Sequence, residues 1–336
     1  MLEPNGSRDH RASSREGVRL GRTGPVVSRI GLGLAATGRP AYITINRDAD
    51  FGIDRSERVF RERTWQLLDA AYTAGVRYVD VARSYGDAET FLGEWMAHRG
   101  DRDDLVVGSK WGYTYVGAWD LSAPVQEVKD LSLANFERQY AETRALLGDH
   151  LRLYQVHSLT IESGALDDKP LLAALMRHRS EGLLIGITTT GPKQAETIRR
   201  ALEVEVDGAP LFSSVQATWN VLEPSAGPAL SEASAAGWAV IVKEALANGR
   251  LTLTGGEGGP ETTLGRAAEA SGVTPDAIAI ATVLAQPWVS VVLSGAATVG
   301  QLASNLGALD VAPVDLPDLA EPADHYWAAR SARPWT

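Results

Sequence analysis

The chain has 336 residues, of which 44% are hydrophobic and 22% charged, and its formal net charge is −10. An acidic surface repels phosphate backbones, so we expect no nucleic-acid partner, and the absence of cysteine excludes disulfides, thiolate catalysis and cysteine-ligated metals. No run approaches the ~18 apolar residues of a membrane helix, so we expect no membrane partner. Residues 1–16 lack the apolar core of a signal peptide, and we expect a disordered arm there and a cytoplasmic protein.

The first predicted element beyond the arm is a β-hairpin over residues 18–28, because a Gly-Pro turn separates two short apolar runs. A strand is expected at 29–33. Residues 39–63 are irregular and rich in Arg and Asp, which favours a long loop. Thr64 is then expected to cap a helix that runs to Ala74, because apolar residues recur there at helical spacing.

From residue 76 onward, short apolar strands alternate regularly with helical segments. Strands that are each followed by a helix are typical of a (β/α)8 TIM barrel, so we expect residues 17–336 to form one barrel domain with an N-terminal β-hairpin. The tail, 311–336, is expected to fold over the surface. The further strands are expected at 77–80, 105–109, 151–157, 183–187, 214–217, 238–242 and 289–293, and the helices at 87–98, 132–147, 169–181, 192–203, 225–236, 261–270, 275–286 and 298–309.

Four polar residues fall at or just beyond the ends of neighbouring predicted strands: Asp80, Tyr85, Lys110 and His157. In a parallel barrel these strand ends meet at one mouth, where the active sites of such folds lie. Taken singly, each residue has an ordinary structural explanation, such as a helix-capping Asp, a packed Tyr or a satisfied core His. Four such groups in register favour a catalytic constellation.

With these four residues, the chain resembles the aldo-keto reductases over about residues 18–309. The resemblance implies a catalytic tetrad on a (β/α)8 barrel and hydride transfer between a nicotinamide cofactor and a carbonyl carbon. Tyr85 would be the general acid in reduction and the base in oxidation. Lys110 would lower the phenol pKa from ~10, Asp80 would hold the Lys110 ammonium, and His157 would orient the substrate oxygen.

A glycine motif near the start of the chain has two interpretations. Residues 31–36 match G-x-G-x-x-A after a predicted strand, which alone would indicate a Rossmann dinucleotide site. A helix should open there, yet Gly38 and Pro40 follow at once, which argues against that site. The resemblance instead makes this the first loop of the barrel, where small residues let a cofactor approach Gly33 and Leu34.

The resemblance also implies a cofactor site that draws on several later loops. Thr188 and Thr189 replace the family's Ser-Asn pair, which binds the carboxamide, and Gln216 matches the family's carboxamide-binding Gln. Lys243 stands where many relatives have an aromatic that stacks on the nicotinamide. The full expected set is Gly33, Leu34, Asp80, Thr188, Thr189, Gln216, Lys243, Leu246, Arg250, Ser294, Gly295, Ala296, Thr298, Gln301 and Asn305.

The sequence predicts NAD(P)(H) with a preference for NAD(H). Relatives that use NADPH usually carry Lys or Arg in the last of these loops, whereas this chain has Gly295, Ala297 and Gln301. A 2′-phosphate without a cationic partner lacks charge-assisted hydrogen bonds. Arg250, or an arginine from 39–63, is the alternative source of such a charge.

The segment at 111–131 is expected to contribute the walls of the substrate pocket. It carries Trp111, Tyr113, Tyr115 and Trp119, which we expect to form pocket walls at the barrel mouth. Packing of these rings onto the barrel is an equally good explanation for any one of them. Aromatic walls would also suit a sugar substrate.

The main functional prediction is a nicotinamide-dependent carbonyl reductase or alcohol dehydrogenase acting on a small-molecule aldehyde, ketone or sugar lactone. A nucleotide-binding regulatory barrel without turnover is the alternative. A barrel hydrolase is disfavoured, because such enzymes use two carboxylates and only Asp80 lies at a strand end. No metal-ligand spacing is present, so no metal is expected. The sequence leaves the oligomeric state open.

Overall fold

Parallel strands form the centre of the molecule. The computed structural model describes residues 16–41, 43, 50–52, 54–100, 102–312 and 314–334, so the predicted arm lies outside the described residues except for Glu16. The strands close into a barrel in the order β12-β13-β14-β3-β4-β5-β8-β9, which confirms the predicted (β/α)8 fold. They are β3 (Ile30–Gly33), β4 (Tyr78–Asp80), β5 (Val106–Trp111), β8 (Leu151–Leu159), β9 (Leu184–Thr189), β12 (Ser214–Thr218), β13 (Ala239–Lys243) and β14 (Val291–Ser294).

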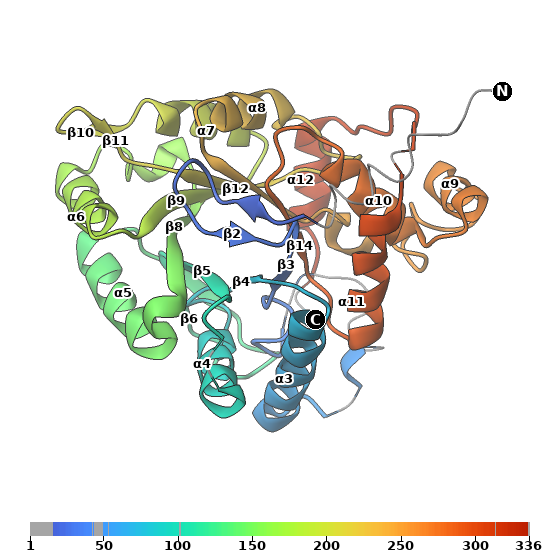
Figure 1. The fold of residues 1–336 in the computed structure, drawn as a ribbon, viewed down its shortest axis with the longest axis horizontal. Helices are drawn as coiled ribbons and strands as arrows, with labels where there is room; N and C mark the ends of the chain where they lie inside the picture. Colours follow the sequence, from blue (N-terminus) through green and yellow to red (C-terminus); the bar gives the residue numbers. More distant parts are fainter. Residues whose placement is uncertain are drawn as a thin grey trace.

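Helices surround this barrel (Figure 1). Their apolar faces pack on the outside of the strands and form the main core. The helices are α3 (Glu57–Thr73), α4 (Ala88–Arg99), α5 (Leu133–Leu147), α6 (Lys169–Ser180), α7 (Gln194–Leu202), α8 (Gly227–Ala235), α9 (Thr263–Ser271), α10 (Pro275–Leu284), α11 (Val299–Leu306) and α12 (Ala323–Ser331), with 3₁₀ turns η1 (Gly148–His150), η2 (Ile161–Ser163), η3 (Ala247–Gly249) and η4 (Gly307–Asp310).

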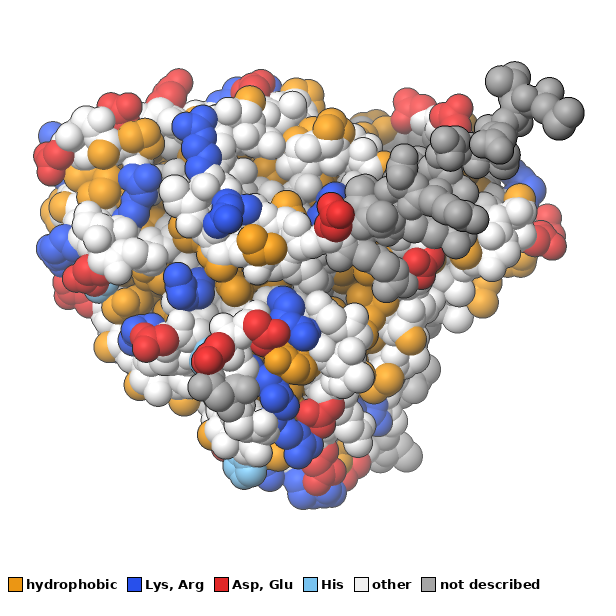
Figure 2. All heavy atoms as spheres, viewed as in Figure 1, with side chains coloured by type: hydrophobic (Ala, Val, Ile, Leu, Met, Phe, Trp, Pro, Cys, Tyr) orange, Lys and Arg blue, Asp and Glu red, His pale blue; other side chains and the backbone are white. Residues whose placement is uncertain are grey.

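The predicted N-terminal hairpin is present and closes one end of the barrel. β1 (Val18–Arg19) and β2 (Val26–Val27) pair antiparallel. The buried side chains of Leu20 and Val27 pack against inward-facing residues of the barrel, including Tyr78 of β4. In the space-filling view of this side, Lys and Arg side chains alternate with Asp and Glu, so neither sign of charge dominates the face (Figure 2).

Helix α3 begins earlier than predicted. It starts at Glu57 after the extended residue Ser56, whereas Thr64 lies inside the helix and its hydroxyl donates to the carbonyl of Phe60 at 2.8 Å. The predicted cap at Thr64 is therefore wrong, and the loop within 39–63 ends sooner. Phe60 explains the difference, because its ring is fully buried and extends the apolar face of the helix by one turn.

Three segments outside the predicted helices and strands contain regular structure. The stretch after β5 forms a hairpin of β6 (Tyr113–Tyr115) and β7 (Glu127–Lys129), and a second small hairpin joins β10 (Glu205–Val206) to β11 (Ala209–Pro210). The C-terminal tail forms α12, in which Tyr326 and Trp327 are buried against the barrel. Within the described residues, no helix is both long and apolar enough to cross a membrane.

Candidate active site

A pocket opens at the carboxyl ends of the barrel strands, and most strands contribute a residue to its wall. The turn after β4 contributes Tyr85, and the β6–β7 hairpin contributes Tyr113 and Glu127. The sequence-predicted residues that line the pocket are Gly33, Asp80, Tyr85, Tyr113, His157, Thr188, Gln216, Lys243 and Gly295.

A buried ion pair lies at the base of this pocket, where Asp80 lines the pocket and Lys110 does not. Lys110 in β5 and Asp80 in β4 are 1% and 2% exposed, and the Lys110 ammonium donates to Asp80 Oδ1 and, at 2.9 Å, to the carbonyl of Val81. The other carboxylate oxygen of Asp80 accepts from Gln216 Nε2 at 2.8 Å. Each buried charge therefore has an oppositely charged partner and at least one further hydrogen bond, which offset the cost of burying it.

Tyr85 lies above this pair, in a tight turn after β4. The Lys110 ammonium lies 4.6 Å from the centre of the Tyr85 ring. Gly38 packs directly against the turn, since a Cβ at that position would collide with the carbonyl oxygen of Tyr85. This contact explains why glycine, rather than a helix-forming residue, follows the glycine motif of β3.

The pKa of Tyr85 is raised, whereas the sequence led us to expect that Lys110 would lower it. Burial, followed by the nearby Asp80 carboxylate, raises the pKa of Tyr85 well above its usual value of 10. A lowering by Lys110 was the expected effect, but the Lys110 charge is neutralised by its own ion pair with Asp80. The phenol therefore stays protonated at neutral pH in this arrangement, as a proton donor must.

His157 at the end of β8 faces Tyr85 and the hairpin. The His157 ring lies 5.7 Å from the Tyr85 ring and 5.1 Å from the Tyr113 ring, edge to face in both pairs, and its Nδ1 lies 3.5 Å from the Ser84 hydroxyl. Burial and the nearby charges of Lys110 and Lys243 hold the pKa of His157 well below 6.5. The imidazole is therefore neutral and can donate one hydrogen bond to an oxygen in the pocket.

Two ion pairs in the pocket wall were not predicted. Arg39 donates to Glu127 of β7 at 2.6 Å, and its guanidinium lies 5.5 Å from the centre of the Tyr85 ring. Arg330 of α12 contacts Glu244 through two nitrogens, at 2.5 and 2.9 Å. Arg39 and Arg330 lie on segments interpreted as a loop and a surface tail, so only their charge in otherwise apolar surroundings could have marked them.

The aromatic residues after β5 do not all reach the pocket. Trp111 is fully buried and packs edge to face on Phe136 of α5, with ring centres 5.0 Å apart, so its predicted role as a pocket wall is wrong. The physical reason is strand alternation, since Lys110 points inward and its neighbour must point outward. Trp119 packs on Phe60 and is not among the residues that line the pocket, so its role as a pocket wall stays a prediction.

Several expected cofactor residues have structural partners and do not line the pocket. Leu34 is fully buried in the core, and the Thr189 hydroxyl contacts Gln194 at 3.4 Å. Arg250 pairs with Glu321 and Glu257, away from the lining residues. Leu246, Ser294, Ala296, Thr298, Gln301 and Asn305 lie outside the lining too, although Ser294 and Ala296 flank Gly295, which does line it.

Hydrogen bonds at the start of α11 hold the loop that joins β14 to this helix. The Thr298 hydroxyl caps the helix by accepting from the backbone of Gln301, as predicted. The Gln301 side chain accepts from the Ala297 backbone at 2.8 Å and donates to Asp50 Oδ1 at 2.7 Å. Position 295 is open, since a Cβ there would meet no atom within 4 Å. The loop therefore presents small residues and one carboxylate, with no cation of its own.

Comparison with known proteins places the chain in a family. The model of the aldo/keto reductase family matches residues 29–323. A stretch of 57 residues is 46% identical to an NADP(+) aryl-alcohol dehydrogenase of Phanerodontia chrysosporium, covering 16% of this chain and 15% of that protein. A stretch of 100 residues is 35% identical to a norsolorinic acid reductase of Aspergillus flavus, covering 28% of this chain and 25% of that protein. The matched stretches span much less than two thirds of these relatives.

Solved structures agree over most of the chain. An aldo-keto reductase from Bacillus halodurans, in its holo form, superposes with a TM-score of 0.67 at 20% identity, covering 94% of this chain and 96% of that one, which shows a common fold. A Pseudomonas aeruginosa structure described under the same family superposes with a TM-score of 0.61 at 25% identity, covering 88% and 94%. Since the family model extends over nearly the whole described chain, the protein belongs to the aldo/keto reductase family, a family of oxidoreductases.

Proposed function

We propose that the protein interconverts a small-molecule aldehyde or ketone and its alcohol by hydride transfer, with Tyr85 as general acid and base. The observation that carries this proposal is the meeting of three groups at one pocket: the protonated Tyr85, the buried Lys110–Asp80 pair and the neutral His157. A regulatory barrel that only binds nucleotide would not need a proton donor and an oxygen-orienting His on the same wall.

The pocket wall suits a flat cofactor ring. Gly33, Ala35, Ala36 and Gly295 line one side with minimal side chains, which lets a ligand approach the backbone closely. Thr188 and Gln216 add hydroxyl and amide groups that match a carboxamide. A nicotinamide cofactor held here would supply the hydride.

Two residues around the substrate oxygen would orient it and supply its proton. His157 would donate a hydrogen bond to the carbonyl oxygen and orient it, and Tyr85 would transfer its phenolic proton to that oxygen as negative charge develops there. The phenolate left behind would lie near Lys110 and Arg39, which are 4.6 and 5.5 Å from the ring centre and are themselves paired with Asp80 and Glu127. Asp80 keeps the Lys110 ammonium in place through this step.

One assay tests the proposal against its alternative. Purified protein is titrated with NADH and with NADPH while the nucleotide fluorescence is followed, and NADH oxidation is then measured with benzaldehyde as a generic substrate. Binding together with turnover supports the proposal. Binding without turnover across a panel of aldehydes and ketones would favour the regulatory barrel, and absence of binding would contradict both.

His157→Ala is expected to lower kcat/KM for benzaldehyde by ~10²-fold, the usual cost of losing one preorganised donor. NADH affinity should change little, because His157 contacts Tyr85, Tyr113 and Ser84 rather than the small-residue wall. His157→Gln keeps a donor and should recover part of the loss, and His178→Ala, on the outer helix α6, serves as the control. Equal losses of turnover and NADH affinity would contradict the role.

The cofactor is expected to be NAD(H), or to be discriminated only weakly. Arg250 is engaged by Glu321 and Glu257, and the group nearest to Gln301 is the carboxylate of Asp50, which would repel a 2′-phosphate. One missing charge-assisted hydrogen bond is worth roughly 1.5–3 kcal/mol, so NADH should bind ~10-fold more tightly than NADPH. In this respect the chain would differ from the relative named for NADP(+).

Side-by-side Kd values for NADH and NADPH decide this prediction. Gln301→Arg and Asp50→Asn should each move the ratio toward NADPH, the first by adding a cation and the second by removing an anion. Asp120→Asn, an exposed carboxylate outside the pocket lining, is the control. NADPH binding ~100-fold more tightly than NADH, or roughly 2.7 kcal/mol, would show that another cation compensates, for which Arg63 beside Asp50 is the first candidate.

A further inference from the structure

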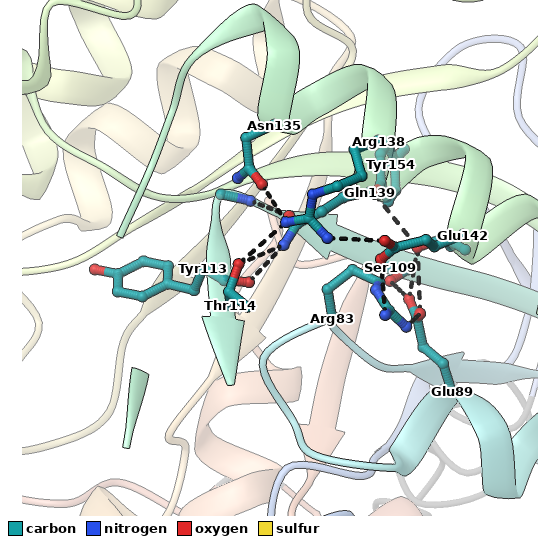
Figure 3. Close-up of polar contacts among 12 residues, drawn as sticks. Arg83, Glu89, Ser109, Tyr113, Thr114, Asn135, Arg138, Gln139, Glu142 and Tyr154 are labelled. Carbon is teal, nitrogen blue, oxygen red and sulfur yellow. Dashed lines mark hydrogen bonds and ion pairs between the residues drawn. The ribbon is translucent and has the colours of Figure 1, made fainter. Parts of the chain in front are cut away.

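A buried carboxylate lies between the barrel wall and two helices. Glu89 of α4 is 1% exposed and accepts hydrogen bonds from Ser109 Oγ at 2.5 Å and Thr143 Oγ1 at 3.0 Å. Arg83 donates to Glu89 Oε2 at 2.8 Å and, through its other terminal nitrogen, to Glu142 of α5 at 2.8 Å. Figure 3 shows the side chains of Arg83, Glu89, Ser109 and Glu142 converging. We call these four residues and Thr143 the Arg83 network.

Stability alone does not account for this network. Burial raises the pKa of Glu89, an effect that Arg83 and Ser109 oppose. Buried ion pairs of this kind can often be replaced by apolar side chains of similar size without loss of stability, because desolvation offsets most of the attraction. Such a network does fix geometry, since every bond has a defined direction and length.

The network joins the two segments that carry the proposed proton donor and its neighbouring cation. Arg83 precedes Tyr85 by two residues in the turn after β4, and its backbone N–H donates to the carbonyl of Lys110 at 3.2 Å. Ser109 is the neighbour of Lys110 in β5 and points to the opposite side of the strand, toward Glu89. Glu89 thus contacts both the segment that carries Tyr85 and the strand that carries Lys110.

A second branch reaches the other wall of the pocket. Glu142 also accepts from Arg138 at 2.8 Å, and Gln139, next to Arg138 in α5, donates to the carbonyl of Tyr113 at 2.9 Å. The Tyr113 ring packs against His157. Figure 3 shows Arg138 and Gln139 between the Glu142 side chain and the β6 strand. The hairpin wall and the Tyr85 turn are thus tied to the same helix.

We propose that Arg83 and Glu89 are positioning residues, which hold the Tyr85 hydroxyl at the distance from Lys110 and the substrate oxygen that proton transfer requires. This inference rests on the proposed role of Tyr85. Neither residue lines the pocket, so neither would touch substrate or cofactor. A displacement of about 1 Å caused by a remote substitution can cost ~10²-fold in rate, which is the effect expected when the network is cut.

The test uses Arg83→Met, Arg83→Lys and Glu89→Gln in the full chain, with NADH and benzaldehyde. Arg83→Met should lower kcat by ~10–100-fold, with KM and the NADH Kd little changed. Arg83→Lys should recover part of the loss, because it keeps a cation near Glu89. Glu89→Gln preserves shape and carries the test if Arg83→Met does not fold. Arg199→Met, which breaks a two-nitrogen contact with Glu232 on the outer helices, is the matched control.

The pH dependence of kcat distinguishes a positioning role of Arg83 and Glu89 from a merely structural one. Moving Tyr85 relative to Lys110 and Asp80 changes the phenol pKa, so the alkaline limb of the kcat profile should shift in the Arg83 and Glu89 variants but not in the control. Lower thermal stability with kcat and its pH profile unchanged would overturn the inference while leaving the proposed function intact. Unchanged kcat in Tyr85→Phe would instead overturn the proposed function.

Discussion

Tyr85→Phe is expected to lower kcat for aldehyde reduction by ~10²–10⁴, the usual contribution of a positioned general acid, and to leave NADH affinity nearly unchanged. The substitution removes only the hydroxyl. The ring that packs edge to face on His157 and lies 4.6 Å from the Lys110 ammonium remains, so the pocket keeps its shape. A loss of turnover without a loss of NADH binding would therefore be due to the missing phenolic proton of Tyr85.

The measurement is steady-state kcat with benzaldehyde, together with an NADH titration by fluorescence. Tyr140→Phe is the matched control, because Tyr140 is a half-buried tyrosine of α5 whose ring packs on His178, away from the pocket. A Tyr85→Phe protein that keeps more than about half of wild-type kcat, well outside the range for a general acid, would show that another group donates the proton.

The pH dependence follows from the sign of the Tyr85 pKa shift. Burial and Asp80 raise the pKa above 10, so the proton-bearing form persists through neutral and mildly alkaline solution. Reductive kcat should therefore show no loss assignable to Tyr85 between about pH 6 and 9. If Lys110 lowered the phenol pKa as the sequence suggested, reduction would fail within that range while oxidation would gain. The reductive and oxidative pH profiles distinguish these two cases.

Local patterns were sufficient to predict the barrel and the four polar residues at its mouth, whereas their grouping as a catalytic tetrad came from the family resemblance. The strands are short, apolar and followed by helical segments, so their identity depends on nearby residues only. Asp80, Lys110 and His157 all fall where an apolar strand gives way to polar residues, a transition visible in the printed sequence. The structure brings all three together with Tyr85 because the ends of parallel strands meet at one mouth.

Other features of the site depend on details that a linear pattern does not contain. Trp111 follows Lys110 directly, and only the alternation of the observed strand shows that it must face the helix layer. Glu127 reaches Arg39 because the segment after β5 folds back as a hairpin, whose register places Glu127 opposite Tyr115. Arg330 approaches the pocket from a helix more than 80 residues beyond Glu244 in the chain.

The C-terminal helix shows how a surface tail becomes part of the site. Trp327 is 4% exposed and its indole nitrogen donates to the buried Glu223 at 3.3 Å, while the Tyr326 hydroxyl accepts from Asn220 at 3.1 Å. These contacts anchor α12 on the barrel and carry Arg330 to Glu244, at the edge of the pocket. The Arg330–Glu244 pair therefore links the stability of the tail to the geometry of the site.

Arg330→Met is expected to lower the free energy of unfolding at pH 7 by less than the ~3–5 kcal/mol that is typical for leaving one member of a buried pair alone, because Lys243 still lies 4.0 Å from Glu244. The Glu244 side chain is only 8% exposed. Burial would by itself raise its pKa, but Lys243 and Arg330 outweigh burial and hold the pKa of Glu244 at about 2. Urea unfolding followed by tryptophan fluorescence measures the change, and Arg199→Met, whose pair with Glu232 is exposed, should have a much smaller effect.

The same pair predicts how stability depends on pH. A carboxylate with a folded-state pKa of about 2, against an ordinary 4.5, stabilises the fold by roughly 3 kcal/mol above about pH 4.5, and this contribution is lost as the pH falls toward 2. Without Arg330 the folded-state pKa of Glu244 should rise toward its ordinary value. The stability of Arg330→Met should therefore fall less steeply than that of the wild type between about pH 4.5 and 2. Parallel curves for the two proteins over this range would contradict the assigned role of Arg330.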